Sequence, residues 1–285
     1  MRSPALSAAL ALFLLACGHG AETGGDAGAA GGGGACWGAR HVGPGDAACA
    51  TGKGGPMRQI PTPSGGTMCI DETEVTVGAY QEFLASGAEV TFPDGDPAKA
   101  RCDAKQGHAP SCEEAKCAGA GCDLPQTCVD QCDAKAYCLW AGKRLCGALA
   151  GGTSALAEAN DPTKSQWQNA CSSGGRDWPY GPSYDAQACN TSDHQPAPCG
   201  GPAVTAGYPA CQAPQGPYDQ VFDLSGNVSE WVDASQEGAD WPEQRCVIMG
   251  GSYVHYWGDA SCTGATLEWP CNAQNPEFGF RCCSM

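Results

Sequence analysis

The stretch Asp223-Leu-Ser-Gly-Asn-Val-Ser-Glu230 has residue types that suit a metal ion. Asp223 and Glu230 supply two side-chain carboxylates, and the backbone carbonyls of Gly226 and Val228 can converge with them within one turn of chain. Ca²⁺ takes hard oxygen ligands from tight loops, so the stretch predicts a structural calcium site. Ser-Gly-Asn is also a turn sequence with or without a metal, and this simpler interpretation stays open.

Other reaction chemistries find little support in the sequence. It contains no serine hydrolase elbow, no phosphate-binding loop and no basic aromatic stripe. An iron facial triad needs two histidines and a carboxylate. The candidates His41, His108, His194 and His255 are scattered and form no helical pair, so the sequence does not favour an iron site.

Two short strands are expected early in the chain. Met57–Ile60 predicts an edge strand that is stopped by Pro61 and Pro63, because proline removes a donor from the ladder. Residues 67–73 predict the second strand. About 230 residues with so little periodic structure indicate one α+β domain, stapled by disulfides where its core is thin.

Three helices are expected, and their apolar sides should contribute to the core of this domain. Thr76 is placed to cap a helix that ends at Gly87. Val129–Ala141 predicts a second helix, which Gly142 terminates, and Ser165–Ala170 predicts a short third one.

The first residues have the pattern of a bacterial signal peptide. Arg2 is followed by Ala5–Ala16, an apolar stretch too short to span a bilayer. Leu14-Leu-Ala-Cys17 resembles a lipobox, so Cys17 is the expected lipidation site, although an ordinary cleaved signal with an incidental cysteine is the alternative. Gly18 after Cys17 favours the outer membrane over the inner one. The expected localisation is therefore lipid-anchored, in the cell envelope or outside the cell.

The expected domain organisation follows from composition. Residues 1–16 are the signal peptide, and 17–34 are the lipidated cysteine with a flexible Gly/Ala tether. Residues 35–55 are a short cysteine-containing segment, and 56–285 are the folded domain with a cysteine-rich insertion at about 100–132.

The formal net charge of −16 limits the partners. It arises from 15 Lys and Arg against 31 Asp and Glu. An acidic surface argues against nucleic acid or an anionic membrane as a partner, so the membrane would be reached through the lipid anchor only.

Cysteine usage points to an oxidising compartment. Of 21 cysteines, 20 remain once Cys17 is set aside, and an even, high number is typical of disulfides. Cys36 and Cys49 are close enough in sequence for a local bridge. Six cysteines lie between Cys102 and Cys132, where some spacings fall within the zinc range. No paired C-x2-C knuckle exists there, so disulfides are favoured over zinc.

Several stretches, in this order, resemble the formylglycine-generating enzyme family (sulfatase-modifying factor domains). They are Met68–Phe83, Ala134–Leu145, Ser165–Cys171, Asp223–Trp231, Gly250–Tyr253 and Gly279–Cys282. The second departs from the family pattern after Leu145, where Cys146 and a Gly/Ala-rich segment intervene. The resemblance implies an irregular, C-type-lectin-like α+β fold with little regular secondary structure and many disulfides.

The resemblance also implies binding sites and disulfide pairings. The family places a calcium ion at the positions of Asp223, Gly226, Val228 and Glu230, and Asn190 and Thr191 resemble its second calcium loop. It further implies the bridges Cys138–Cys282 and Cys171–Cys262. Both would close long loops, which constrain the unfolded chain most.

Active members of the family bind copper between two cysteines just after Gly-Gly-Ser. In this chain no cysteine lies between Val247 and Ser261, and His255 stands about where the first would fall. The second would fall near Ala260, or near Trp257 with a short deletion. Copper is therefore not expected.

His255 and Cys262 are the candidates for a rearranged mixed site, since imidazole and thiolate both suit copper. The resemblance assigns Cys262 to a disulfide instead. The candidate groove of this region is formed by Gly250, Gly251, Ser252, Tyr253, His255 and Trp257.

The sequence therefore predicts an extracytoplasmic lipoprotein whose domain is non-catalytic and binds a peptide, glycan or envelope partner. The alternative is a metal-dependent oxidoreductase of the formylglycine-generating type, with a rearranged metal site and a protein cysteine or another substrate. A disulfide-hardened structural lipoprotein is a third possibility.

Overall fold

A computed structural model describes most of the folded part of the chain. The described residues are 45–49, 52–112, 121–172, 175–194, 200–236, 244–264 and 267–285. The described residues all belong to one compact unit, which spans residues 35–285. The expected lipidation site Cys17, the tether and Cys36 all lie outside the described residues.

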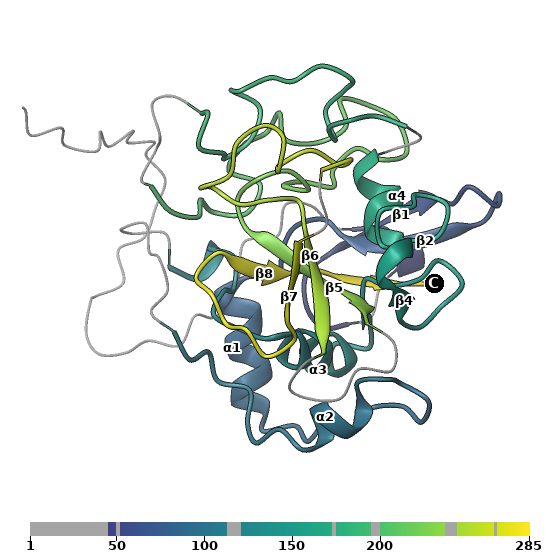
Figure 1. The fold of residues 1–285 in the computed structure, drawn as a ribbon, viewed down its shortest axis with the longest axis vertical. Coiled ribbons are helices and arrows are strands. Elements are labelled where there is room, and N and C mark those ends of the chain that lie inside the picture. The colour runs from purple at the N-terminus through teal and green to yellow at the C-terminus, as the bar shows by residue number, and fades with distance from the viewer. Residues whose placement is uncertain are drawn as a thin grey trace, which may run out of the picture. The chain divides into compact units, whose positions relative to one another are not determined.

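One sheet of four strands joins the beginning of the domain to its end (Figure 1). Its order is β1-β2-β9-β3, and every neighbouring pair is antiparallel. The strands are β1 (Met57–Pro61), β2 (Thr67–Asp71), β3 (Arg144–Leu145) and β9 (Cys282–Ser284). The first strand is an edge strand as expected, but it includes Pro61, and the second ends two residues earlier than predicted.

The second sheet is built around one fully buried strand, β5 (Ser229–Ser235). It runs β4-β5-β6-β7, and β8 also pairs with β5 in parallel. The other members are β4 (Ser154–Ala155), β6 (Arg245–Met249), β7 (Leu267–Pro270) and β8 (Phe278–Phe280). Because β5 begins at Ser229, inside the predicted calcium stretch, this sheet positions Glu230.

Helix boundaries follow local capping chemistry. In α1 (Val77–Ser86), the Thr76 hydroxyl accepts from the Ala79 N–H, and Gly87 ends the helix at φ +59°. The expected second helix is α3 (Gln131–Trp140), which begins two residues later than predicted because Asp130 and Asp133 form a capping box.

The remaining helices within the described ranges are short. They are α2 (Lys99–Asp103), α4 (Gln166–Ser172), and three 3₁₀ turns at Ala47–Cys49, Gly121–Asp123 and Leu156–Glu158. The expected third helix is α4, which extends two residues beyond the prediction. In the described residues, no helix has the length and apolar character needed to cross a bilayer.

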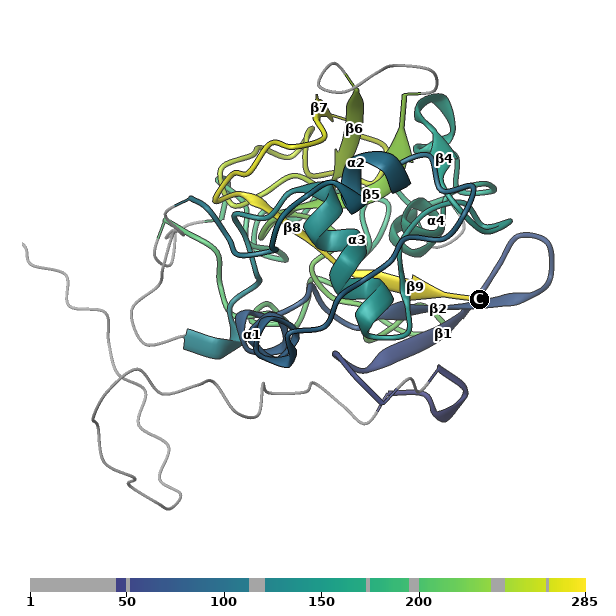
Figure 2. The same ribbon diagram turned by 90° about the horizontal axis from the view of Figure 1, so that it is seen from below.

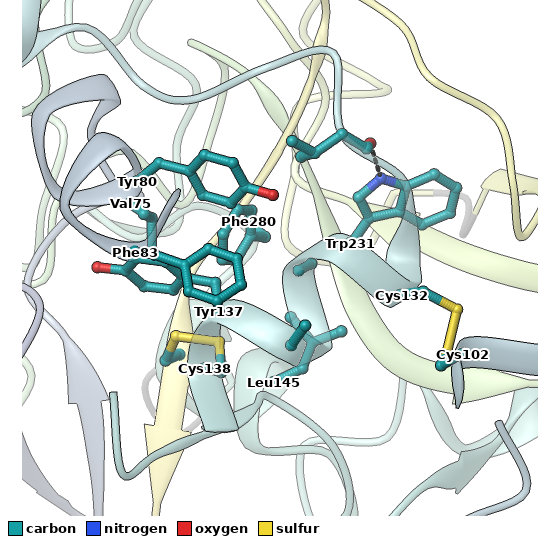
Figure 3. Packing of buried hydrophobic residues seen from close by; sticks show 14 of the residues in the cluster. Val75, Tyr80, Phe83, Cys102, Cys132, Tyr137, Cys138, Leu145, Trp231 and Phe280 are labelled. Carbon is teal, nitrogen blue, oxygen red and sulfur yellow. Dashed lines mark hydrogen bonds between the residues drawn. A yellow bond between two sulfur atoms is a disulfide. The ribbon is translucent and has the colours of Figure 1, made fainter. Parts of the chain in front are cut away.

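The core lies where α1 and α3 pack against the sheets (Figure 2). The rings of Tyr80 and Tyr137 stack at 5.6 Å between centroids, and Phe280 of β8 packs edge-on against Tyr137 (Figure 3). The indole N–H of Trp231 donates to the carbonyl of Val129 at 2.9 Å, so its one polar group is satisfied in the core.

Disulfides cross-link this core. The bridges implied by the family resemblance, Cys138–Cys282 and Cys171–Cys262, are both present. The predicted Cys36–Cys49 bridge is wrong: Cys49 is bonded to Cys69 of β2, because the 3₁₀ turn that carries it lies against β1. The other pairs with both cysteines among the described residues are Cys102–Cys132, Cys112–Cys128, Cys146–Cys283, Cys189–Cys211 and Cys246–Cys271.

Every cysteine among the described residues is disulfide-bonded. The adjacent Cys282 and Cys283 of β9 point to opposite sides and are bonded to Cys138 and Cys146, so the last strand is anchored covalently on both faces. This density of disulfides is that of an extracytoplasmic protein.

Candidate functional site

The loop that enters β5 turns sharply against a second segment of the chain. Asp223, Gly226 and Asn227 all have φ near +60° to +80°, and a Cβ on Gly226 would lie 2.4 Å from the carbonyl oxygen of Asn190. The Asn227 N–H donates to that same oxygen at 2.8 Å. Glycine is therefore required at 226, and the structure brings the two predicted calcium segments into contact.

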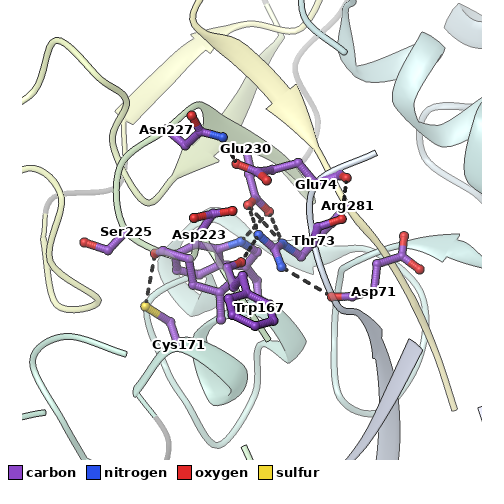
Figure 4. Close-up of polar contacts among 12 residues, drawn as sticks. Asp71, Thr73, Glu74, Trp167, Cys171, Asp223, Ser225, Asn227, Glu230 and Arg281 are labelled. Carbon is purple, nitrogen blue, oxygen red and sulfur yellow. Dashed lines mark hydrogen bonds and ion pairs between the residues drawn. The ribbon is translucent and has the colours of Figure 1, made fainter. Parts of the chain in front are cut away.

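Glu230 forms a buried ion pair with Arg281 (Figure 4). Arg281 Nη2 lies 2.6 Å from Glu230 Oε1, and Nε donates to both carboxylate oxygens at 2.9 and 2.8 Å. The indole N–H of Trp167 donates to Oε2 at 2.8 Å. Both oxygens of Glu230 are thus already bonded, and Arg281, the arginine of the Gly-Phe-Arg-Cys string, is the residue that fixes them.

Glu74 is a third carboxylate in this cluster, and the sequence analysis missed it. Its Oε1 accepts from the side chain of Asn227 at 2.9 Å, while its buried Oε2 has no hydrogen-bond donor. Oδ2 of Asp223 accepts from the Ala206 N–H at 2.6 Å. Glu74 lies just after β2, within the Met68–Phe83 stretch that resembles the family. That stretch served to locate a strand and a helix, and its position is the signal that could have marked Glu74.

The charges of this cluster are unequal. Three buried carboxylates (Glu74, Asp223 and Glu230) face one guanidinium, as Figure 4 shows. Burial raises the pKa of Asp223 to about 7, and burial together with the charge of Asp223 raises the pKa of Glu74 well above its usual range. The cluster therefore suits either a shared proton or an additional cation.

The donor set meets some of the requirements of calcium. Asp223 and Glu74 offer carboxylate oxygens in a cluster where carboxylates outnumber the guanidinium. The buried Oε2 of Glu74, which accepts no hydrogen bond, is an acceptor that a hard cation would satisfy. Glu230 would have to share its oxygens with Arg281. Within the described residues, no three His, Cys, Asp or Glu side chains are grouped as a ready metal site.

Asn190 and Thr191 are buried beside this loop, and several of their polar groups are already hydrogen-bonded. The Asn190 side-chain amide donates to the carbonyl of Gly201 and to Oδ1 of Asn227, both at 3.1 Å. The Thr191 carbonyl accepts from the His194 N–H at 3.1 Å. The contact between Asn190 and Asn227 ties the two loops together, which is a structural role that needs no metal.

The Gly250–Trp257 segment follows β6. A Cβ on Gly250 would lie 3.0 Å from the Trp167 ring, and Gly250 and Gly251 have φ of +86° and +67°. The backbone therefore passes close to the core here, which only glycine permits.

His255 is held by Ser252. Its Nδ1 accepts from the Ser252 N–H at 3.0 Å and lies 2.8 Å from the Ser252 hydroxyl, which is also 3.1 Å from Glu277. Ser252 is fully buried, so its hydroxyl cannot reach a substrate as a nucleophile. The trio stabilises the turn.

Cys262 is not available as a metal ligand. Its sulfur is bonded to that of Cys171 at 2.02 Å, and the residue is buried. A copper ligand must be a thiolate, and a disulfide sulfur is not one. The prediction of a mixed copper site formed by His255 and Cys262 is therefore wrong, because the sulfur of Cys262 is bonded to Cys171.

Two large rings project from this segment. The residues 253–259 form a stretch, called here the aromatic loop, in which the residues Tyr256 and Trp257 are 63% and 58% exposed. Val254 in the same stretch is also exposed. Ser252 and Gly251 are buried below them, so of the predicted groove residues only Tyr253, His255 and Trp257 reach the surface.

Comparison with known proteins gives one family. The profile of the FGE-sulfatase family, described as a sulfatase-modifying factor enzyme 1-like domain, matches residues 38–285. A Bos taurus protein named inactive C-alpha-formylglycine-generating enzyme 2 is 27% identical over 176 residues, which cover 57% of this chain and 50% of that protein. The chain thus spans about half the length of the curated relative it matches.

Three solved structures are similar at low identity. Variable protein 1 of Treponema denticola is 16% identical with a TM-score of 0.46, and the match covers 77% of this chain and 84% of that one. PvdO of Pseudomonas aeruginosa is 18% identical with a TM-score of 0.49, and the match covers 81% of this chain and 92% of that one. CarF is 18% identical with a TM-score of 0.47, and the match covers 81% of this chain and 95% of that one. Likenesses at this level carry no functional argument.

Proposed function

Because this chain belongs to the sulfatase-modifying factor enzyme 1-like family, we propose that it is a non-catalytic, surface-tethered member of that family. Its role is to bind a peptide, glycan or envelope partner at the aromatic loop. The observation that carries the proposal is the Cys171–Cys262 bridge, which occupies the cysteine nearest to the family's copper position.

Two further observations support a non-catalytic role. His255, which stands about where the first copper cysteine would fall, is hydrogen-bonded to Ser252 through Nδ1. The matched bovine relative is named as an inactive enzyme, although it covers only part of this chain. Activity of the formylglycine-generating type needs thiolate ligands for copper, and none of the described cysteines is a free thiol.

Calcium is proposed as a structural ion at the entry to β5. Asp223 and Glu74 would contribute carboxylate oxygens and Gly226 and Val228 their backbone carbonyls, while Glu230 stays paired with Arg281. Such an ion would neutralise the excess charge of the buried cluster. The second proposed site at Asn190 and Thr191 has less support, since the Asn190 amide nitrogen and the carbonyls of both residues are already hydrogen-bonded.

The cellular setting is proposed from the N-terminus. A signal peptide over 1–16, lipidation at Cys17 and a Gly/Ala tether over 17–34 would hold the domain at the outer membrane, facing an oxidising compartment. Mass spectrometry of the protein from a bacterial envelope would detect the diacylglyceryl group on Cys17. Cleavage of the signal peptide at another position, with no lipid on Cys17, would contradict the proposed lipid anchor.

The decisive experiment joins thiol counting, metal analysis and an activity assay on the purified chain. We expect no reactive thiol under denaturing conditions without reductant, no copper bound after incubation with Cu(I), and no oxygen consumption with a cysteine peptide. Two reactive thiols with stoichiometric copper and peptide oxidation would overturn the proposal in favour of the oxidoreductase.

A further inference from the structure

We propose that the aromatic loop receives a lysine- or arginine-bearing segment of a partner protein. The inference names the class of ligand for the binding role proposed above and rests on that role. It is carried by three observations: where the exposed apolar side chains gather, how firmly the loop is held, and which charges surround it.

Exposed apolar side chains concentrate in this loop. Six large hydrophobic side chains are exposed among the described residues, and three of them, Val254, Tyr256 and Trp257, fall within four consecutive positions. The other three are dispersed: they are Leu84, Trp269 and Met285. A soluble domain rarely leaves such a group exposed without a function, and Trp and Tyr are the side chains most enriched at binding hot spots.

The loop backbone is fixed before any partner arrives. The His255 carbonyl accepts from the Ser192 N–H at 3.0 Å and from its hydroxyl at 2.9 Å. The Trp257 N–H donates to Oδ2 of Asp193 at 3.0 Å, and the carbonyl of Tyr256 accepts from two following N–H groups at 3.1 Å. Rigid presentation of two rings reduces the entropy lost on binding.

Carboxylates lie at the loop, and the part of the sequence that carries it is acidic. Between residues 165 and 285 the sequence has thirteen Asp and Glu against three Arg and no Lys. Next to the rings, Asp193 contacts the Trp257 backbone and the hydroxyl of Tyr184, and the exposed Asp259 follows two residues later.

In the described part of the chain, none of the three arginines forms a hydrogen bond or an ion pair with the aromatic loop. Arg281 is buried against Glu230, and Arg245 lies on β6, at the start of that strand. The side chain of Arg176 donates to the carbonyl of Pro179. An aromatic face flanked by carboxylates attracts a cation, because the ring quadrupole and the carboxylate charges act in the same direction.

A guanidinium or ammonium group is therefore the complementary ligand group. It would lie over the ring of Trp257 or Tyr256 and pair with a neighbouring carboxylate, while its aliphatic stem covers exposed ring surface. An anionic ligand would meet the opposite field, so the same surface disfavours acidic peptides and nucleic acid.

The test uses the full chain and two synthetic peptides of equal shape. One is acetyl-(Gly-Arg)4-amide, and the other carries citrulline, an uncharged isostere, in place of arginine. Isothermal titration calorimetry should show binding of the arginine peptide at low salt and at least tenfold weaker binding of the citrulline peptide. Trp257→Ala and Tyr256→Ala should each weaken arginine-peptide binding about 2- to 30-fold, the range that one cation–π contact supplies.

Trp269→Ala is the matched control, since Trp269 is also an exposed tryptophan but lies on β7. It should leave the affinity unchanged, and thermal unfolding should show that all three variants fold. Equal affinity for the two peptides, or an unchanged affinity in Trp257→Ala, would overturn the inference. If a neutral glycan or peptide binds instead and is lost in Trp257→Ala, the proposed binding function stands and the cationic ligand class fails. If no glycan or peptide of any charge binds, both fail.

Discussion

Arg281 and Glu230 form a buried ion pair with 2.6 Å between Nη2 and Oε1, and Trp167 completes the carboxylate's hydrogen bonds. The pair joins the end of β8 to the start of β5 across 51 residues of sequence. Arg281 also donates to the carbonyl of Phe222 at 2.7 Å, so one side chain holds both ends of the loop that enters β5.

Removing one partner of this pair should be costly. Glu230→Gln removes the only carboxylate that is hydrogen-bonded to the buried Arg281 guanidinium among the described residues, and we expect a loss of about 3–5 kcal/mol in the free energy of unfolding by denaturant titration. The control is Glu158→Gln, which breaks the exposed pair with Lys164 and should cost less than about 1 kcal/mol. Equal effects of the two changes would mean that the buried pair contributes little.

Stability of the calcium-free protein should fall as pH rises from about 4 to about 7. The pKa of Asp223 is raised by burial to about 7 from an ordinary value of 3.8, so in this window the folded state holds a proton that the unfolded state has released. The slope is at most about 1.4 kcal/mol per pH unit for one proton. Thermal unfolding in chelator at pH 5 and pH 7.5 would check this, and Asp223→Asn should flatten the dependence. An equally steep fall in that variant would assign the effect to another group.

Calcium should reverse that loss if the proposed site is occupied. At a hundredfold excess over the dissociation constant, bound Ca²⁺ would add about 2.7 kcal/mol at pH 7.5. Glu74→Gln should reduce this gain, because it removes a carboxylate from the buried cluster, whereas the exposed Glu82→Gln should not. A calcium response that is absent from the unmodified chain contradicts the calcium proposal.

Gly226 should tolerate no side chain. Gly226→Ala places a Cβ 2.4 Å from the Asn190 carbonyl oxygen at φ +77°, so the backbone must shift, and we expect at least about 3 kcal/mol of destabilisation. Gly65→Ala is the matched control, since Gly65 has φ +87° but nothing within 4 Å of the added Cβ. It should cost about 1 kcal/mol. Similar values for both would show that conformational strain, and not the contact with Asn190, limits this position.

The Cys171–Cys262 bridge should contribute more stability than a bridge over a shorter loop. Replacing both cysteines by serine releases a constraint over 91 residues, worth about 4–5 kcal/mol in the chain-entropy account. The same change at Cys189 and Cys211, 22 residues apart, should cost about 1 kcal/mol less. Denaturant titrations of the two variants provide the comparison, and a larger loss from the shorter loop would show that local packing dominates.

Much of the local structure could be predicted from the sequence. The cap at Thr76, the stop at Gly87 and the turn at Gly226 each follow from the chemistry of one residue and its immediate neighbours. The long-range bridges Cys138–Cys282 and Cys171–Cys262 were reached only through the family resemblance, because residue types and spacing leave disulfide connectivity open. The same limit explains why Cys49 was assigned to Cys36 instead of Cys69.

What the sequence by itself determined was the family, the oxidising compartment and the absence of a cysteine pair after Gly-Gly-Ser. Tertiary structure alone decided that Glu74, Asp223 and Glu230 share one buried cluster with Arg281, and that Trp257 is exposed beside Asp193. The physical reason is that these residues lie up to about 200 positions apart in sequence. Their charges and rings acquire a function only when the sheets bring them within a few ångströms, and no local pattern encodes that distance.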